Sequence, residues 1–142
     1  MNISQSKLKT FRRCPKQYEY KYIEGLEPVR KSVPLALGNW IHSMLEAHYK
    51  GEDWLETYGE LTHKFNGFLT EEKEHYGDLP GISARLMNGY MDFWEEEDKN
   101  LEIISVEEDF EVTITGGLNF KFKPDMIVRD KRDGTVSCWD HK

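Results

Sequence analysis

The spacing of apolar residues divides the chain into a helical part and a strand-rich part. Up to about residue 100, apolar positions recur every three or four residues, the period of a helix that buries one face. From Leu101 onward apolar and polar residues alternate, as they do along a strand with one buried face. Helices followed by strands predict a mixed α/β or α+β domain in which the strands form a short antiparallel meander.

Four helices are predicted in the first part. Ser4 or Ser6 can cap the first one, because either hydroxyl can accept a hydrogen bond from an N–H group of the first turn. Glycine and proline residues separate the others, since neither continues a helix readily. The predicted helices cover approximately residues 4–18, 35–50, 53–68 and 82–98.

The last part predicts strands separated by two turns. Residues 101–114 form either one strand or a bent pair, and Gly116-Gly117 supplies the turn that follows. A further strand runs to about residue 128, and a turn at 130–134 leads into a last strand, 135–142.

The final hairpin would place charged residues together. If its turn is centred between Arg132 and Asp133, Asp125 and Asp140 are equally far from it and face one another. Alternation then puts Lys142 on the same side as Asp140, and His141 on the opposite side.

Asp125, Asp140 and Lys142 suit the hydrolysis of a phosphodiester. Facing carboxylates repel one another in a sheet, and a divalent cation turns this repulsion into coordination. A bound metal ion polarises the phosphate and activates a water molecule, while a lysine offsets the charge of the transition state. The alternative is that both aspartates are ordinary exposed residues near turns.

His42 and Glu46 are a further candidate pair. They are four residues apart, so they lie on one face of the predicted helix, beside its apolar stripe. An imidazole together with carboxylates favours Mg²⁺ or Mn²⁺ and tolerates softer metals. His42 is therefore either a metal ligand or a histidine on the flank of the helix.

The chain resembles the RecB-like nucleases of the PD-(D/E)-x-K superfamily, which have AddB-type, CRISPR-adaptation and phage exonuclease members. The residues that carry the resemblance follow the family's order from 4 to 142. They are an N-terminal signature within 4–23, the pattern Gly38…His42…Leu45-Glu46, and the elements Pro124-Asp125 and Asp140-His141-Lys142. The resemblance implies an α/β fold with a restriction-endonuclease-like core, a helical N-terminal part and a short antiparallel meander.

The resemblance also assigns roles to residues. It implies that Mg²⁺ or Mn²⁺ is bound by His42, Asp125, Asp140 and the backbone carbonyl of His141, with Lys142 as the catalytic lysine. Glu46 either supports the site or is structural. The implied activity is a metal-dependent deoxyribonuclease that degrades DNA from its ends. Alternatives are a non-catalytic DNA-binding or assembly module and an inactive fragment of a nuclease.

Two family features are missing from the sequence. Family members continue beyond the lysine into a strand and a helix with a Gln-x-x-x-Tyr element, so we expect a domain truncated at its C-terminus. Some members bind a 4Fe-4S cluster through an early cysteine, placed like Cys14, and three late cysteines. Such a cluster would need further cysteines beyond residue 142, and Cys14 is otherwise a buried cysteine.

The length and composition favour a single intracellular domain. A chain of 142 residues can bury one core, and its N-terminus lacks the apolar stretch of a signal peptide. No apolar run reaches the roughly 20 residues that span a membrane, so we expect a cytoplasmic protein without membrane contact. The expected domain has a basic and aromatic segment at 1–31, helices at 32–100 and active-site strands at 101–142.

The charge is unevenly distributed. Residues 1–31 contain eight Lys and Arg against three Glu, although the whole chain has a net charge of −7. Basic side chains can neutralise phosphates and aromatic rings can stack on bases, so Arg12, Arg13 and Lys16 are candidate DNA contacts. The alternative is an amphipathic helix with a basic solvated face. DNA is the expected partner, with recombination or phage replication proteins as further candidates.

Overall fold

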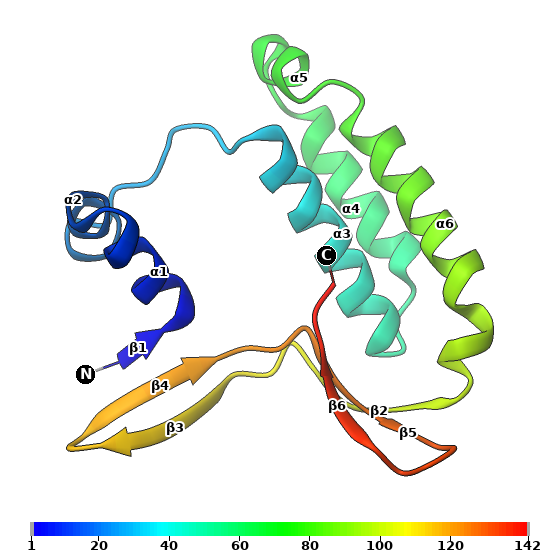
Figure 1. Ribbon diagram of the computed structural model, residues 1–142. Helices are drawn as coiled ribbons and strands as arrows, with labels where there is room; N and C mark the ends of the chain where they lie inside the picture. The colour runs from blue at the N-terminus through cyan, green and yellow to red at the C-terminus, as the bar shows by residue number, and fades with distance from the viewer. Residues whose placement is uncertain (1, 142) are drawn as a thin grey trace. The chain divides into compact units, whose positions relative to one another are not determined.

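The computed structural model describes residues 2–141 and consists of two compact units (Figure 1). The first unit contains the chain up to residue 30 together with residues 108–124, and the second contains residues 31–107 and the chain from residue 125 onward. The strand region is therefore shared between the units, because the segment 108–124 leaves the second unit and returns to it.

The first unit begins with a short strand and a broken helix. Its elements are β1 (Asn2–Ser4), α1 (Gln5–Arg13), α2 (Pro15–Tyr18), a π-helical turn (Glu19–Ile23), β3 (Phe110–Thr115) and β4 (Leu118–Phe122). Ser4 caps α1, since its hydroxyl accepts a hydrogen bond from the Lys7 N–H at 3.4 Å. Pro15 lacks an N–H group, which explains why α1 stops before it and a new helix begins there.

A three-stranded sheet completes the first unit. β4 is its central strand, paired in antiparallel fashion with β3 and in parallel with β1. Gly116 and Gly117 form the predicted turn between β3 and β4, and both adopt positive φ angles, which glycine does at little cost. The pairing puts aromatic rings on one face, where Phe122 stacks on both Phe110 and Phe120.

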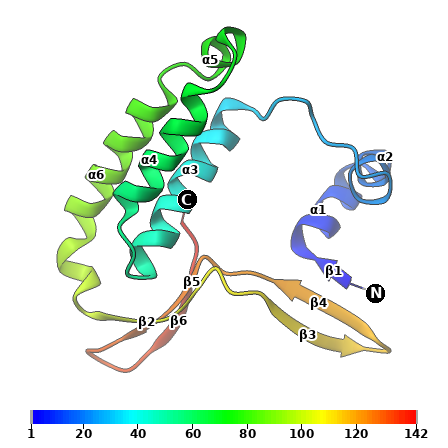
Figure 2. The same ribbon diagram turned by 180° about the vertical axis from the view of Figure 1, so that it is seen from behind.

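The second unit is built from helices followed by a sheet. Its elements are α3 (Val33–Tyr49), α4 (Trp54–Asn66), α5 (Thr70–Tyr76), α6 (Leu79–Asp98), β2 (Leu101–Val106), β5 (Met126–Asp130) and β6 (Val136–Trp139). Figures 1 and 2 show α3, α4 and α6 side by side. Asp53 and Asp78 cap α4 and α6, because each carboxylate accepts a hydrogen bond from an N–H group of the first turn.

The core of the second unit lies between these helices and the sheet. Met44, Met87 and Met126 are fully buried and come from α3, α6 and β5. Trp40 of α3 packs edge-on against Phe65 of α4, at 6.1 Å between ring centroids. The helices and the sheet thereby share one core, to which α3 contributes Trp40, Met44 and Leu45.

The sheet of the second unit has β5 at its centre, between β2 and β6, with both pairings antiparallel. In the β5–β6 hairpin Met126 faces Trp139 and Arg129 faces Val136. This is the register expected from a turn centred between residues 132 and 133, so that prediction is confirmed.

The predicted α/β class is confirmed, with two differences in detail. The expected meander is divided between two sheets, and β1 joins one of them in parallel although its three residues gave no strand signal. The third predicted helix ends at Asn66, and α5 forms a separate helix after it. No helix among residues 2–141 is both long and apolar enough to cross a membrane.

Candidate metal centre

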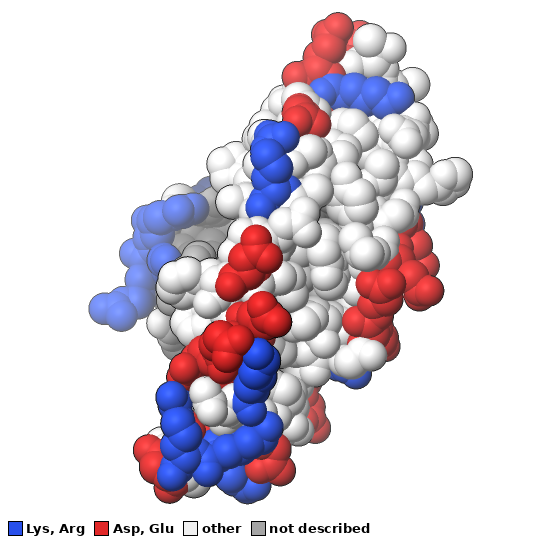
Figure 3. All heavy atoms as spheres, turned by 90° about the vertical axis from the view of Figure 1, so that its right-hand side faces the viewer, with Lys and Arg blue, Asp and Glu red and all other residues white. Residues whose placement is uncertain are grey.

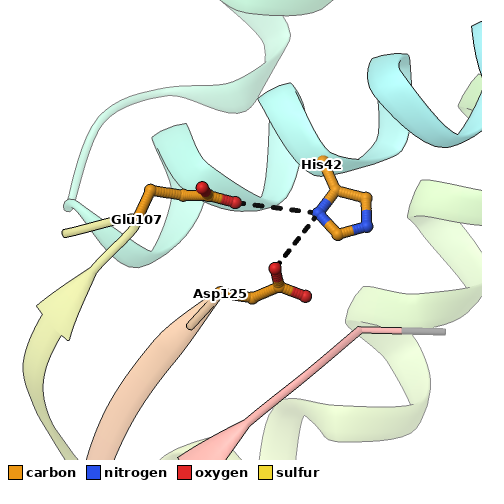
Figure 4. A group of neighbouring side chains, drawn as sticks. All are labelled: His42, Glu107 and Asp125. Atoms are coloured by element: carbon orange, nitrogen blue, oxygen red, sulfur yellow. Dashed lines mark ion pairs between the residues drawn. The ribbon is translucent and has the colours of Figure 1, made fainter. Parts of the chain in front are cut away.

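Three side chains from different elements of the second unit converge on one point (Figure 4). His42 lies in the middle of α3, Glu107 directly follows β2, and Asp125 directly precedes β5. The helix is held by its buried face, and the two strands are neighbours in the sheet. The fold thus brings together residues that are 18 to 83 positions apart in the chain.

The geometry suits a divalent cation. His42 Nδ1 lies 3.7 Å from Glu107 Oε1 and 3.6 Å from Asp125 Oδ1, and the three ligand atoms are all within 4.8 Å of one another. The carboxylate side chains are only 15% and 13% exposed, and two such groups this close repel one another unless a cation lies between them. One imidazole nitrogen and two carboxylate oxygens fit Mg²⁺ or Mn²⁺.

Backbone contacts hold Asp125 and Glu107 in place. The Glu107 N–H donates to the Asp125 carbonyl at 2.9 Å, one residue beyond the last pair of β2 and β5. The His141 N–H donates to Asp125 Oδ2 at 2.6 Å, so the other oxygen of this carboxylate, Oδ1, faces His42. Glu107 has a φ of 51°, a conformation that is unusual for a residue other than glycine and is often found at functional sites.

The side chain of His141 lies beside the cluster. The centroid of the His141 ring is 6.2 Å from that of the His42 ring. The His141 ring also stacks on the Tyr49 ring, with an interplanar angle of 8°. Burial lowers the pKa of His141, an effect that Asp125 partly opposes. The prediction that His141 points away from the site is wrong: strand pairing ends at Trp139, and the site lies on the helix-covered face of the sheet.

The other predicted residues are placed as follows. Asp140 lies on the wall of a cavity that also includes His42 and His141, but it does not belong to the three-residue cluster found among the described residues. Lys142 lies outside the described residues. Glu46 forms an ion pair with Lys50, one turn along α3, and the structure does not bring it to the cluster.

The cavity beside the cluster is mainly apolar. It measures about 800 Å³ and is lined by residues of α3, α6 and β6, together with the chain just after β6. Leu86 of α6 is half-exposed there, and Trp94 packs edge-on against Trp139 at 5.7 Å between centroids. The metal centre therefore lies at the edge of a large apolar depression.

The basic residues predicted to contact DNA lie in the first unit. Arg12 and Arg13 are exposed in the last turn of α1, and Arg13 donates to Gln17 at 2.6 Å. Lys16 pairs with Glu19 at 2.7 Å, which offsets part of its charge. Cys14, the candidate cluster ligand, is a partly buried free cysteine between α1 and α2.

Charges in the second unit are largely mixed. Figure 3 shows one face on which Lys and Arg gather at one end among Asp and Glu, next to a broad uncharged area. Ion pairs account for several basic groups of this unit: Arg132 binds Glu97 and Asp130, and Arg129 binds Glu102. A continuous track of basic side chains is not visible on the face drawn.

Glu107 was not predicted from the sequence. It stands in the acidic run Glu107-Glu108-Asp109, which has no spacing that singles out one of its members. Knowledge that Val106 pairs with Met126 would have identified Glu107, because the next residues along the two strands are Glu107 and Asp125. That pairing depends on a bulge in β2, between Ile103 and Ser105, which alternation alone does not reveal.

The family is identified by comparison with known proteins. The family model described as the PD-(D/E)XK nuclease superfamily matches residues 2–142, nearly the whole chain. The chain therefore belongs to the PD-(D/E)XK nuclease superfamily, whose members are metal-dependent phosphodiester hydrolases. Among proteins with curated descriptions the comparison finds no match. The α/β architecture and the His42, Glu107 and Asp125 cluster agree with this membership.

Proposed function

We propose that this protein is a Mg²⁺- or Mn²⁺-dependent deoxyribonuclease of the RecB-like type that degrades DNA from its ends. The cluster of His42, Glu107 and Asp125 is the observation that supports this most directly. A structural role would not need two largely buried carboxylates whose oxygens lie within 4.8 Å of one another and of an imidazole nitrogen. The superfamily membership makes a phosphodiester the substrate class.

In the proposed site, His42, Asp125 and Asp140 bind the metal ion, with the backbone carbonyl of His141 as a further ligand. When bound, the ion would supply Lewis acidity toward the scissile phosphate and toward the attacking water. Glu107 contributes a second carboxylate, which faces the same His42 nitrogen as Asp125, and it would act either as a ligand or through a bound water. Glu46 has a supporting role on the same helix.

Lys142 is the proposed catalytic lysine. The sequence order Asp140-His141-Lys142 resembles the Asp-x-Lys element of the family, in which a lysine accompanies the last acidic ligand. A positively charged amine near the reacting phosphate would offset the negative charge that develops in the transition state. It would also orient the attacking water through its N–H donors.

Arg12, Arg13 and Lys16 are proposed to contact the DNA backbone. They lie on consecutive turns of α1 and α2 and are exposed, with only the Lys16 charge paired closely to a carboxylate. Phosphate contacts of this kind contribute affinity without reading sequence. Cleavage by the protein should therefore depend strongly on salt and weakly on base sequence.

The test is cleavage of end-labelled linear DNA and of covalently closed circular DNA, with Mn²⁺, with Mg²⁺ and with EDTA. We expect metal-dependent loss of the linear substrate, while the closed circle survives, and loss of this activity in Asp125→Ala and Lys142→Ala. Glu102→Gln is a matched control, because it removes a carboxylate from the same sheet outside the cluster. Cleavage of the circle would overturn the exonuclease assignment, and full activity of Asp125→Ala would overturn the metal site.

A further inference from the structure

A series of hydrogen-bonded polar side chains connects α3, α6 and His141 beside the candidate metal centre. Tyr49 lies at the end of α3, and its hydroxyl is 2.8 Å from that of Tyr90 on α6. The Tyr49 hydroxyl also donates to both oxygens of Asp98, at 3.2 and 3.1 Å. The Tyr90 hydroxyl is 3.4 Å from His141 Nδ1, so the connection ends on the ring beside the cluster.

The protons in this series can be assigned by counting donors. Burial raises the pKa of the Tyr49 and Tyr90 hydroxyls, so each retains a single proton. The Asp98 carboxylate can only accept, hence Tyr49 gives its proton to Asp98 and must accept from Tyr90. Tyr90 then has no proton left for the imidazole.

His141 must therefore carry its proton on Nδ1 and donate it to the Tyr90 oxygen, leaving Nε2 without one. All the bonds run in the same direction, from His141 through Tyr90 and Tyr49 to Asp98. Bonds in such a series polarise and strengthen one another. Tyr49 adds a flat surface parallel to the imidazole, at 5.7 Å between centroids, so the ring is fixed in both position and tilt.

A fixed His141 also fixes a carboxylate of the metal centre. The N–H of the same residue donates to Asp125 Oδ2 at 2.6 Å. A donor on one carboxylate oxygen limits rotation of the group and leaves Oδ1 toward His42. Movement of the His141 backbone would release this constraint, because β6 ends at Trp139 and ladder pairing does not extend to His141.

We infer that Tyr90, Tyr49 and Asp98 are positioning residues, which hold His141 as its Nδ1-protonated tautomer and through its backbone N–H pre-orient Asp125 for metal binding. The inference rests on the proposed function only in taking Asp125 as a metal ligand. Outer partners of this kind commonly change metal affinity by about 10- to 100-fold when they are removed. These residues act through His141, so we expect an effect at the lower end, about tenfold.

The tautomer is tested on metal-free protein by nitrogen-15 NMR of the histidine rings. We expect the His141 signals of the wild type to show a proton on Nδ1, and those of Tyr90→Phe to lose this pattern. Phenylalanine keeps the ring and removes only the acceptor oxygen. Tyr58→Phe is the matched control, since its hydroxyl donates to the Pro80 carbonyl at 3.4 Å, in the first turn of α6 and ten residues before Tyr90. A wild-type proton on Nε2 would refute the assignment.

Metal affinity is tested by calorimetric titration with Mn²⁺ of the wild type, Tyr90→Phe, Tyr49→Phe and Tyr58→Phe. We expect about tenfold weaker binding in the first two variants and wild-type binding in the control. Equal affinity of all four proteins would overturn the positioning role while leaving the metal site intact. No binding by the wild type would instead overturn the proposed function, and the NMR result would still decide the tautomer. Melting curves of the metal-free variants identify any general loss of fold.

Discussion

Replacing Glu107 by glutamine should have opposite effects on the stability of the protein with and without metal. Glu107 and Asp125 present oxygens within 4.8 Å of one another, and two unit charges at that distance repel by about 3 kcal/mol at an effective dielectric constant of about 20. The nearby His42 imidazole and the partial solvent exposure of both carboxylates reduce this repulsion. We expect Glu107→Gln to stabilise the metal-free protein by about 1 kcal/mol, or about 3 °C in melting temperature.

Metal should reverse the order. The lost carboxylate attracts the cation with an energy similar to the repulsion, so we expect the Kd for Mn²⁺ to rise by about 100-fold. At a concentration about 100 times its own Kd, the wild type gains about 2.7 kcal/mol from Mn²⁺, whereas the variant gains about 0.4 kcal/mol. The variant should then melt below the wild type in Mn²⁺ and above it in EDTA.

The assay is thermal unfolding followed by circular dichroism in EDTA and in Mn²⁺. Glu102→Gln provides the control, because it removes a surface ion pair with Arg129, which contributes about 0–1 kcal/mol, and leaves the cluster unchanged. Its melting temperature should fall slightly and by the same amount in both conditions. Two results would refute the reasoning. One is a lower melting temperature of Glu107→Gln than of the wild type in EDTA, and the other is an equal rise of the melting temperature in Mn²⁺ for the wild type and Glu107→Gln. Either result would mean that Glu107 and Asp125 do not repel one another or do not share a metal ion.

Other changes test the core, an acidic group and the DNA contacts. Met126→Ala removes a fully buried side chain and should cost about 2–5 kcal/mol in urea unfolding; a smaller cost would mean that β5 is not central to the core. Burial raises the pKa of Asp98, so its contribution to stability is fully present at low pH and declines as pH rises through the folded-state pKa. Asp98→Asn should flatten this decline in pH-dependent unfolding, and an unchanged profile would contradict it. Arg12→Ala with Arg13→Ala should weaken DNA binding and lower the salt slope by about one per contact, which a salt titration measures.

Local sequence signals were sufficient for the two long helices α3 and α6 and for one hairpin. The period of the apolar residues located α3 and α6, because each buries one face against the core. The β5–β6 register followed from the turn alone, since a short antiparallel hairpin has few alternatives once its turn is placed. His42 and Asp125 could therefore be named as candidates that meet, and the structure brings them to 3.6 Å.

The pairing of strands that are distant in the sequence could not be predicted from local patterns. Glu107 reaches the cluster because β2 pairs with β5 across a bulge, and the partner of a strand about 20 residues away is not encoded in its alternation. β1 joins its sheet through three residues, too few to show a period. His141 was placed on the wrong side because alternation was extended beyond Trp139, where the strand ends.

The apolar depression beside the metal centre gives the protein an optical reporter. Two of its four tryptophans, Trp94 and Trp139, line this depression, while Trp40 is buried in the core. Their emission depends on the water around the indole rings, so any molecule that fills the depression will shift the fluorescence without a label. A dye that fluoresces in apolar surroundings would bind in this depression in the folded protein as well. Its signal would then not distinguish folded from unfolded protein, so intrinsic tryptophan fluorescence is the better probe of unfolding.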